Sequence, residues 1–263
     1  MPSFSDLDEV ARKALTIFYV LDTSGSMTGA PISTVNSAMR ETIEVLKHEA
    51  KNNADAQLKI AVLSFNSNAT WLNPNGAEDI EDFPNDDLQA GGLTAMGKAL
   101  DELNDKLSRH KFLQSVAGNL MPVIVFMTDG YATDDYRKAL DRIRQNKWFK
   151  RVAKIGFAIG DDADIEMICS IVGNREAVIH TDDLDVFKKL LQFVSVTSSM
   201  LVSSTVTGNE GTTGKTIVGQ AVDEGLVPPG ALVGDTVSYD PEPETSVAFD
   251  GSDSDDDWGG DWD

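Results

Sequence analysis

Cysteine is almost absent from this chain of 263 residues. Cys169 stands alone, so no intramolecular disulfide can form and a metal site built on several thiolates is excluded. No apolar run approaches the roughly 20 residues that a membrane-spanning helix needs. The run at residues 14–21 is also too short, and too acidic in its flanks, for a signal peptide. We therefore expect a cytoplasmic protein.

Positive charge is missing from the C-terminal part of the chain. Residues 216–263 contain 13 acidic residues and no Lys or Arg, within a total net charge of −21. Residues 1–215 are acidic as well, so neither part offers the basic surface that nucleic acid or an anionic membrane would require. We expect neither to be a partner.

What the chain does contain is an alternation of apolar strands and amphipathic helices. Continuous apolar runs rich in β-formers predict strands that are buried on both faces. These runs lie at residues 15–21, 59–65, 122–128, 152–160 and 177–181, with a short antiparallel edge strand expected at 69–72. Helical spacing follows from Pro31 onward and at residues 95–109, 136–149, 162–172 and 184–201.

This order predicts an α/β fold. We expect a doubly wound, mostly parallel sheet of about six strands, with one antiparallel edge strand and helices on both faces. Residues 1–203 would form this domain. Residues 204–263, rich in Gly, Ser and acids, would form a flexible, largely disordered extension. Within it, 208–216 (GNEGTTGKT) lacks a glycine at the position a phosphate-binding loop requires, so we interpret it as a linker.

Oxygen-bearing side chains follow the strands at three places. The first strand runs into DTSGS at residues 22–26, GGLT at 91–94 precedes a helix, and MTDG at 127–130 ends another strand. In parallel sheets ligands bind at the carboxyl ends of the strands. Two carboxylates and three hydroxyls suit a hard divalent ion, Mg²⁺ or Mn²⁺. The predicted ligands are Asp22, Ser24, Ser26, Thr94 and Asp129.

These motifs, in this order, resemble the metal-ion-dependent adhesion site of von Willebrand factor A domains, over roughly residues 14–200. The resemblance implies Ser24, Ser26 and Thr94 as direct ligands, with Asp22 and Asp129 binding directly or through water. It also implies a non-enzymatic module that binds a partner protein's Asp or Glu carboxylate through the ion.

Three spacer segments narrow the resemblance further. GAPISTVNSAM, TDGYATDDYRKAL and AIGDDADIEMICSI are similar to the bacterial TerY-like A domains of tellurite and stress-resistance operons. That similarity implies a scaffold in a stress-response or defence system, with a kinase and a phosphatase as partners.

Two other readings of the site compete with this one. DTSGS is also typical of a helix N-cap. A haloacid dehalogenase-like phosphatase would use Asp22 as its nucleophile, with Thr128 and Asp161 or Asp164 in supporting roles. Such an enzyme needs a second Asp at position 24 as general acid, and that residue is Ser.

The last residues suggest a second binding element. Asp257 and Trp258, then Asp261 and Trp262, form two Asp-Trp pairs in an acidic segment. The plain interpretation of such a segment is a solvated tail. Aromatic residues flanked by acids also suit a short peptide that binds a basic groove. A metal-independent scaffold that acts only through this tail is therefore a further alternative.

Overall fold

The computed structural model describes residues 12–53, 56–84, 86–115, 118–204 and 213–235. A sheet forms its centre, with the strand order β3-β2-β1-β5-β6-β7 and a two-residue strand, β4, that also pairs with β2. The strands are β1 (Lys13–Asp22), β2 (Ala56–Phe65), β3 (Ala69–Trp71), β4 (Glu78–Asp79), β5 (Val123–Thr128), β6 (Ala153–Ile159) and β7 (Val178–Thr181).

The main strands are parallel, and only β3 and β4 run antiparallel to β2. The predicted α/β sheet with its antiparallel edge strand is confirmed. The described residues form seven strands where about six were expected, and the additional one is β4, a two-residue acidic strand that no apolar run marks in the sequence.

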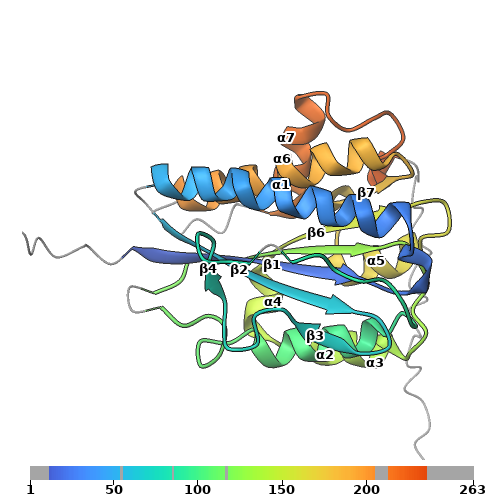
Figure 1. Ribbon diagram of the computed structural model, residues 1–263, viewed down its shortest axis with the longest axis horizontal. Helices are drawn as coiled ribbons and strands as arrows, with labels where there is room; N and C mark the ends of the chain where they lie inside the picture. The colour runs from blue at the N-terminus through green and yellow to red at the C-terminus, as the bar shows by residue number, and fades with distance from the viewer. Residues whose placement is uncertain (1–11, 54–55, 85, 116–117, 205–212, 236–263) are drawn as a thin grey trace, which may run out of the picture.

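Helices cover both faces of the sheet (Figure 1). The first face carries α1 (Ala30–Asn52), α6 (Leu184–Ser204) and α7 (Gly214–Asp223). The second carries α2 (Met96–Lys106), α3 (Tyr136–Ile143), α4 (Lys147–Arg151) and α5 (Ile165–Val172). Short 3₁₀ turns are η1 (Gly25–Met27), η2 (Arg175–Ala177) and η3 (Val233–Asp235). None of the described helices combines the length and the apolar content of a membrane span.

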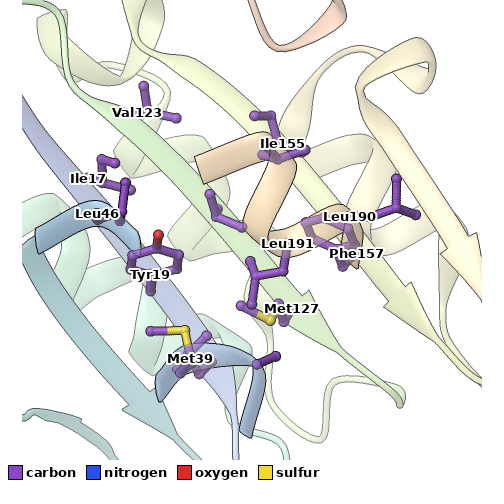
Figure 2. Packing of buried hydrophobic residues seen from close by; sticks show 14 of the residues in the cluster. Ile17, Tyr19, Met39, Leu46, Val123, Met127, Ile155, Phe157, Leu190 and Leu191 are labelled. Atoms are coloured by element: carbon purple, nitrogen blue, oxygen red, sulfur yellow. The ribbon is translucent and has the colours of Figure 1, made fainter. Parts of the chain in front are cut away.

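The side chains of β1 point alternately to the two faces of the sheet, and both faces are apolar, so helices cover both. Ile17 and Tyr19 point into the core beneath α1 and α6, whereas Phe18 and Val20 point into the core beneath α2 and α5. Figure 2 shows Tyr19 among residues of α1 and the central strands in the first of these cores. Its hydroxyl donates to Ser195 Oγ of α6 at 2.8 Å, so the one polar atom of this side chain has a partner.

Residues 136–149 were predicted to form one helix and instead form parts of two. The side chain of Asn146 accepts hydrogen bonds from the backbone N–H groups of Trp148 and Phe149, which makes it the N-cap of α4. The chain therefore turns between α3 and α4.

Residues 213–235 were predicted to belong to a flexible extension and instead pack on the domain. Gly214, expected in a linker, begins α7, and Ile217, Val218 and Ala221 of this helix are fully buried. Farther along, Leu232 pairs with Ile179 of β7 in an antiparallel bridge. This segment thus completes the core and covers the edge of the sheet. Residues 236–263 lie outside the described part of the chain.

Candidate functional site

Three loops meet at the carboxyl edge of the sheet. β1 ends at Asp22 and its neighbour β5 ends at Thr128, so the residues that follow the two strands are adjacent. The segment 91–94, which precedes α2, joins them through the backbone. Gly25 N–H donates to Gly92 O at 3.0 Å, and Gly91 N–H donates to Thr23 O at 2.9 Å.

A left-handed backbone conformation and a close neighbour explain Gly92 of this loop. Gly92 has φ +88°, and a Cβ there would lie 2.7 Å from Ser67 Oγ. A side chain would therefore be strained in conformation and would collide with the neighbouring loop.

Asp22 is buried, with 1% of its surface exposed. Its Oδ1 accepts from the backbone N–H of Ser24 at 2.8 Å, and its Oδ2 accepts from Thr128 Oγ1 at 2.5 Å. Asp22 therefore fixes the start of the DTSGS loop and links it to the end of β5.

A chain of hydroxyls leads from this buried carboxylate to a second, more exposed one. Ser26 Oγ donates to Asp129 Oδ1 at 2.7 Å, and Ser24 Oγ lies 3.0 Å from Ser26 Oγ. Because the Ser26 hydroxyl donates its one proton to Asp129, the Ser24 hydroxyl must be the donor in the hydrogen bond between the two serines. Four of the five predicted ligands are thus connected by hydrogen bonds.

Thr94 reaches the same place from the third loop. A Cβ built on Gly130 would lie 3.6 Å from Ser26 Oγ and 4.0 Å from Thr94 Oγ1, so both hydroxyl oxygens lie close to Gly130. The backbone of Thr94 is held by Thr133, whose hydroxyl accepts from Thr94 N–H at 3.1 Å and whose N–H donates to Thr94 O at 2.8 Å.

Burial dominates the electrostatics of the two carboxylates. It raises the pKa of Asp22, while hydrogen bonds from Thr128 and Ser24 oppose the shift. It also raises the pKa of Asp129, where the negative charge of Asp162 adds to the effect and the Ser26 hydroxyl opposes it. The ionised forms are therefore disfavoured unless positive charge approaches.

The donor set fits a small divalent cation. No group of three or more His, Cys, Asp or Glu side chains in the described ranges is arranged to hold a metal ion. This site has only two carboxylates and depends on hydroxyls for its remaining oxygens, which is a donor set that Mg²⁺ and Mn²⁺ accept.

Three supporting residues were not among the predicted ligands. Thr128 binds Asp22, Thr133 holds Thr94, and Asp134 accepts from the first free N–H groups of α2, those of Gly97 at 2.9 Å and Lys98 at 3.1 Å. All three lie in the segment 128–134, directly around Asp129. The density of Thr and Asp in this segment was the available signal. The tail residues Asp257, Trp258, Asp261 and Trp262 lie outside the described residues.

A family model described as von Willebrand factor type A domain matches residues 16–193. Similar solved structures include a von Willebrand factor type A protein from Catenulispora acidiphila, with a TM-score of 0.56 and 17% identity over 71% of this chain and 43% of that chain. The pilus adhesin SpaC from Lactobacillus rhamnosus GG has a TM-score of 0.54 and 11% identity over 71% of this chain and 31% of that chain.

Proximal thread matrix protein 1 from the mussel byssus, described with a zinc-occupied MIDAS motif, has a TM-score of 0.50 and 18% identity. That match covers 70% of this chain and 45% of the mussel protein. No curated protein matches the sequence. The matched region spans less than half of each of these three solved chains, and at such identities the likeness shows the fold alone.

Proposed function

The chain belongs to the von Willebrand factor type A family. We propose that it is a non-enzymatic binding module in which a divalent cation binds a carboxylate of a partner protein. The observation that carries the proposal is the connected set of hydroxyls and carboxylates at one edge of the sheet. The residues that would hold the ion are Asp22, Ser24, Ser26, Thr94 and Asp129.

Each of these residues has a distinct task. Asp22 orients the DTSGS loop and contributes charge from a buried position, whereas Asp129 presents a carboxylate nearer to solvent, oriented by Ser26. The hydroxyl of Thr94, which like that of Ser26 lies near Gly130, would contribute a further oxygen. A bound Mg²⁺ or Mn²⁺ would supply a Lewis-acidic centre that accepts an oxygen from an Asp or Glu of the partner.

The rim of the site indicates what surrounds that partner carboxylate. Leu93 is 60% exposed and Tyr131 is 64% exposed, and each adjoins a residue of the site, Thr94 and Gly130. Large apolar side chains at this exposure are candidates for protein contacts. We infer that the partner presents its acidic residue next to an apolar one.

The geometry also weighs against the phosphatase alternative. A nucleophilic carboxylate needs an oxygen that can reach the phosphorus atom of the substrate. Both oxygens of Asp22 already accept hydrogen bonds, and the residue is buried. Ser24 occupies the position of the required general acid, and its hydroxyl is directed to Ser26.

The biological setting that we propose rests on the spacer sequences alone. Their similarity to TerY-like domains supports a scaffold role in a bacterial tellurite or stress response, in the cytoplasm, with a kinase and a phosphatase as partners.

The test is a calorimetric titration of the full chain with Mn²⁺ and with Mg²⁺, with and without acetate as a simple carboxylate. Thr94→Val removes a proposed ligand with little change of shape. Thr70→Val, an exposed residue of β3, is the matched control.

We expect Thr94→Val to weaken Mn²⁺ binding by roughly 10-fold or more, since loss of even an indirect partner of a metal ligand costs about 10–100-fold. Thr70→Val should bind Mn²⁺ with the affinity of the wild type. Acetate should strengthen Mn²⁺ binding to the wild type and to Thr70→Val. Equal Mn²⁺ affinity in the two variants would refute the ligand assignment. An unchanged affinity in the presence of acetate would refute the carboxylate mechanism while leaving the metal site intact.

A further inference from the structure

Basic side chains gather on one surface of this acidic chain, away from the proposed metal site. Eight of the 22 Lys and Arg residues lie in residues 136–154, which contain a single acid. The guanidinium carbon of Arg109 lies 5.6 Å from the ring centroid of the half-buried Trp148 in α4. We name the α4 basic surface after this helix. It consists of Trp148 and four exposed cations, Arg109, Lys147, Lys150 and Arg151.

Local acids leave part of this charge uncompensated. In the neighbouring helix α3, Arg142 binds Asp101 with two hydrogen bonds of 2.9 and 2.6 Å. By contrast, no residue in the described ranges forms an ion pair with Lys147 or Lys150. These two ammonium groups are therefore available to a ligand of opposite charge.

The chain itself brings such a ligand to the same edge of the sheet. α4 immediately precedes β6, and β6 and β7 are parallel neighbours, so α4 and the start of β7 share the edge opposite to Asp22. Gly234, near the end of the described chain, lies there too, because a Cβ on it would be 2.8 Å from Glu176 Cγ, just before β7. Val233 and Phe149 of α4 are both buried on the second face of the sheet.

The tail that follows, residues 236–263, complements the α4 basic surface in charge and in chemistry. It contains ten acidic residues, no Lys or Arg, and two tryptophans, Trp258 and Trp262. Its 28 residues could extend on the order of 90–100 Å, so reach does not limit where it binds. Tethering gives it an effective concentration that is typically in the mM range. Arginine and tryptophan on the surface can also contact aromatic rings of the tail.

Electrostatics distinguish the α4 basic surface from the metal face, by which we mean the edge of the sheet that carries the proposed metal site at Asp22 and Asp129. Without a bound cation that face carries the negative charges of Asp129 and Asp162, which repel an acidic segment, whereas the α4 basic surface is positive whether or not a metal ion is bound. We propose that residues 236–263 dock in cis on the α4 basic surface, so that the chain covers its own positive patch at the edge opposite to the metal site. A basic surface of another protein would then compete with α4 for the two Asp-Trp pairs.

The first test is zero-length carbodiimide cross-linking of the full chain, which joins carboxylates to lysines in contact. An equal mixture of ¹⁵N-labelled and unlabelled protein identifies the chain from which each peptide comes. We expect cross-links from the tail to Lys147 and Lys150, with both peptides from the same chain. Cross-links between labelled and unlabelled peptides would overturn docking in cis, and an even spread over all exposed lysines would overturn the choice of surface.

The second test is acrylamide quenching of tryptophan fluorescence in full-chain variants, with Trp258→Phe/Trp262→Phe used to subtract the domain's own signal. Lys147→Gln/Lys150→Gln should lower the ratio of docked to free tail about four-fold, at about two-fold per exposed ion pair. The tail tryptophans should then be quenched more strongly.

Lys51→Gln/Lys189→Gln removes the same charge from exposed positions on α1 and α6, on the other face of the sheet, and should leave quenching unchanged. Equal effects of the two double variants would show a response to net charge alone and would refute the proposal.

Discussion

Gly214→Ala tests whether residues 213–235 belong to the folded domain. A Cβ on Gly214 would lie 1.9 Å from Lys154 O and 3.0 Å from Ala177 Cβ, whereas ordinary contacts begin at 3.4 Å. The amino end of α7 must therefore withdraw from β6 by about 1.5 Å, the difference between 3.4 and 1.9 Å. A gap of this size removes much of the dispersion attraction across the contact.

The cost follows from what α7 buries. Ile217 and Val218 are fully buried, and exposing both would cost about 3–6 kcal/mol, at roughly 1.5–3 kcal/mol for each side chain. Partial withdrawal should cost about 3 kcal/mol of unfolding free energy, a large share of the 5–15 kcal/mol typical of a domain.

The same helix supplies the matched control. Nothing lies within 4 Å of a Cβ built on Gly219, so Gly219→Ala should stabilise α7 by about 0.5–1 kcal/mol through backbone entropy. Urea unfolding followed by circular dichroism measures both variants. If Gly214→Ala were as stable as Gly219→Ala, α7 would not pack on β6 as described, and residues 213–235 would not be part of the folded structure.

Two further measurements address electrostatics and the separation of the two surfaces. Arg175 donates to both oxygens of Glu166 at 2.9 and 2.8 Å and lowers the pKa of that carboxyl from 4.5. The ion pair therefore stabilises the fold above pH 4.5, and this stabilisation is lost as the pH falls through the lowered pKa of Glu166. Glu166→Gln should therefore be less stable than the wild type by about 0.5 kcal/mol at pH 7. In urea unfolding this difference in unfolding free energy should shrink as the pH is lowered. A difference that does not depend on pH would contradict a stabilising ion pair between Arg175 and Glu166. Truncation after residue 235 should leave the Mn²⁺ affinity unchanged, because the proposed docking on the α4 basic surface keeps the tail at the edge opposite to Asp22. Stronger Mn²⁺ or acetate binding by the truncated chain would mean that the tail occupies the metal face.

Long apolar strands were predictable from the sequence because their burial requires little beyond their own composition. β1 lies between two neighbours and under helices on both faces, so nearly all of its residues had to be apolar. The motifs that carry the proposed ligands were equally visible, since parallel strands bring their carboxyl ends to one edge. Thr128 and Thr133 were harder to assign, because their partners are 106 and 39 residues away along the chain.

The predictions from sequence were wrong where local composition indicates one structure and tertiary contacts impose another. Asn146 sits in an apparently continuous helical pattern, but its side chain satisfies the N–H groups of a new helix and so divides the pattern in two. Gly214 looked like part of a linker because it stands among Gly and Thr residues. In the fold it is required for the opposite reason, since only glycine lets α7 approach the backbone of Lys154.

The arrangement of α7 also bears on how the proposed surfaces relate to each other. By pairing Leu232 with the exposed edge of β7, the segment 213–235 covers backbone groups that could otherwise pair with another chain. The same segment ends at the amino edge of the sheet, the edge at which α4 also lies. β5 and β6, six and seven residues long, then separate that edge from Asp129 by about 20 Å. A partner bound through its carboxylate at the metal face and a basic partner that captures the tail could therefore bind at the same time, which is the geometry that a scaffold for two proteins requires.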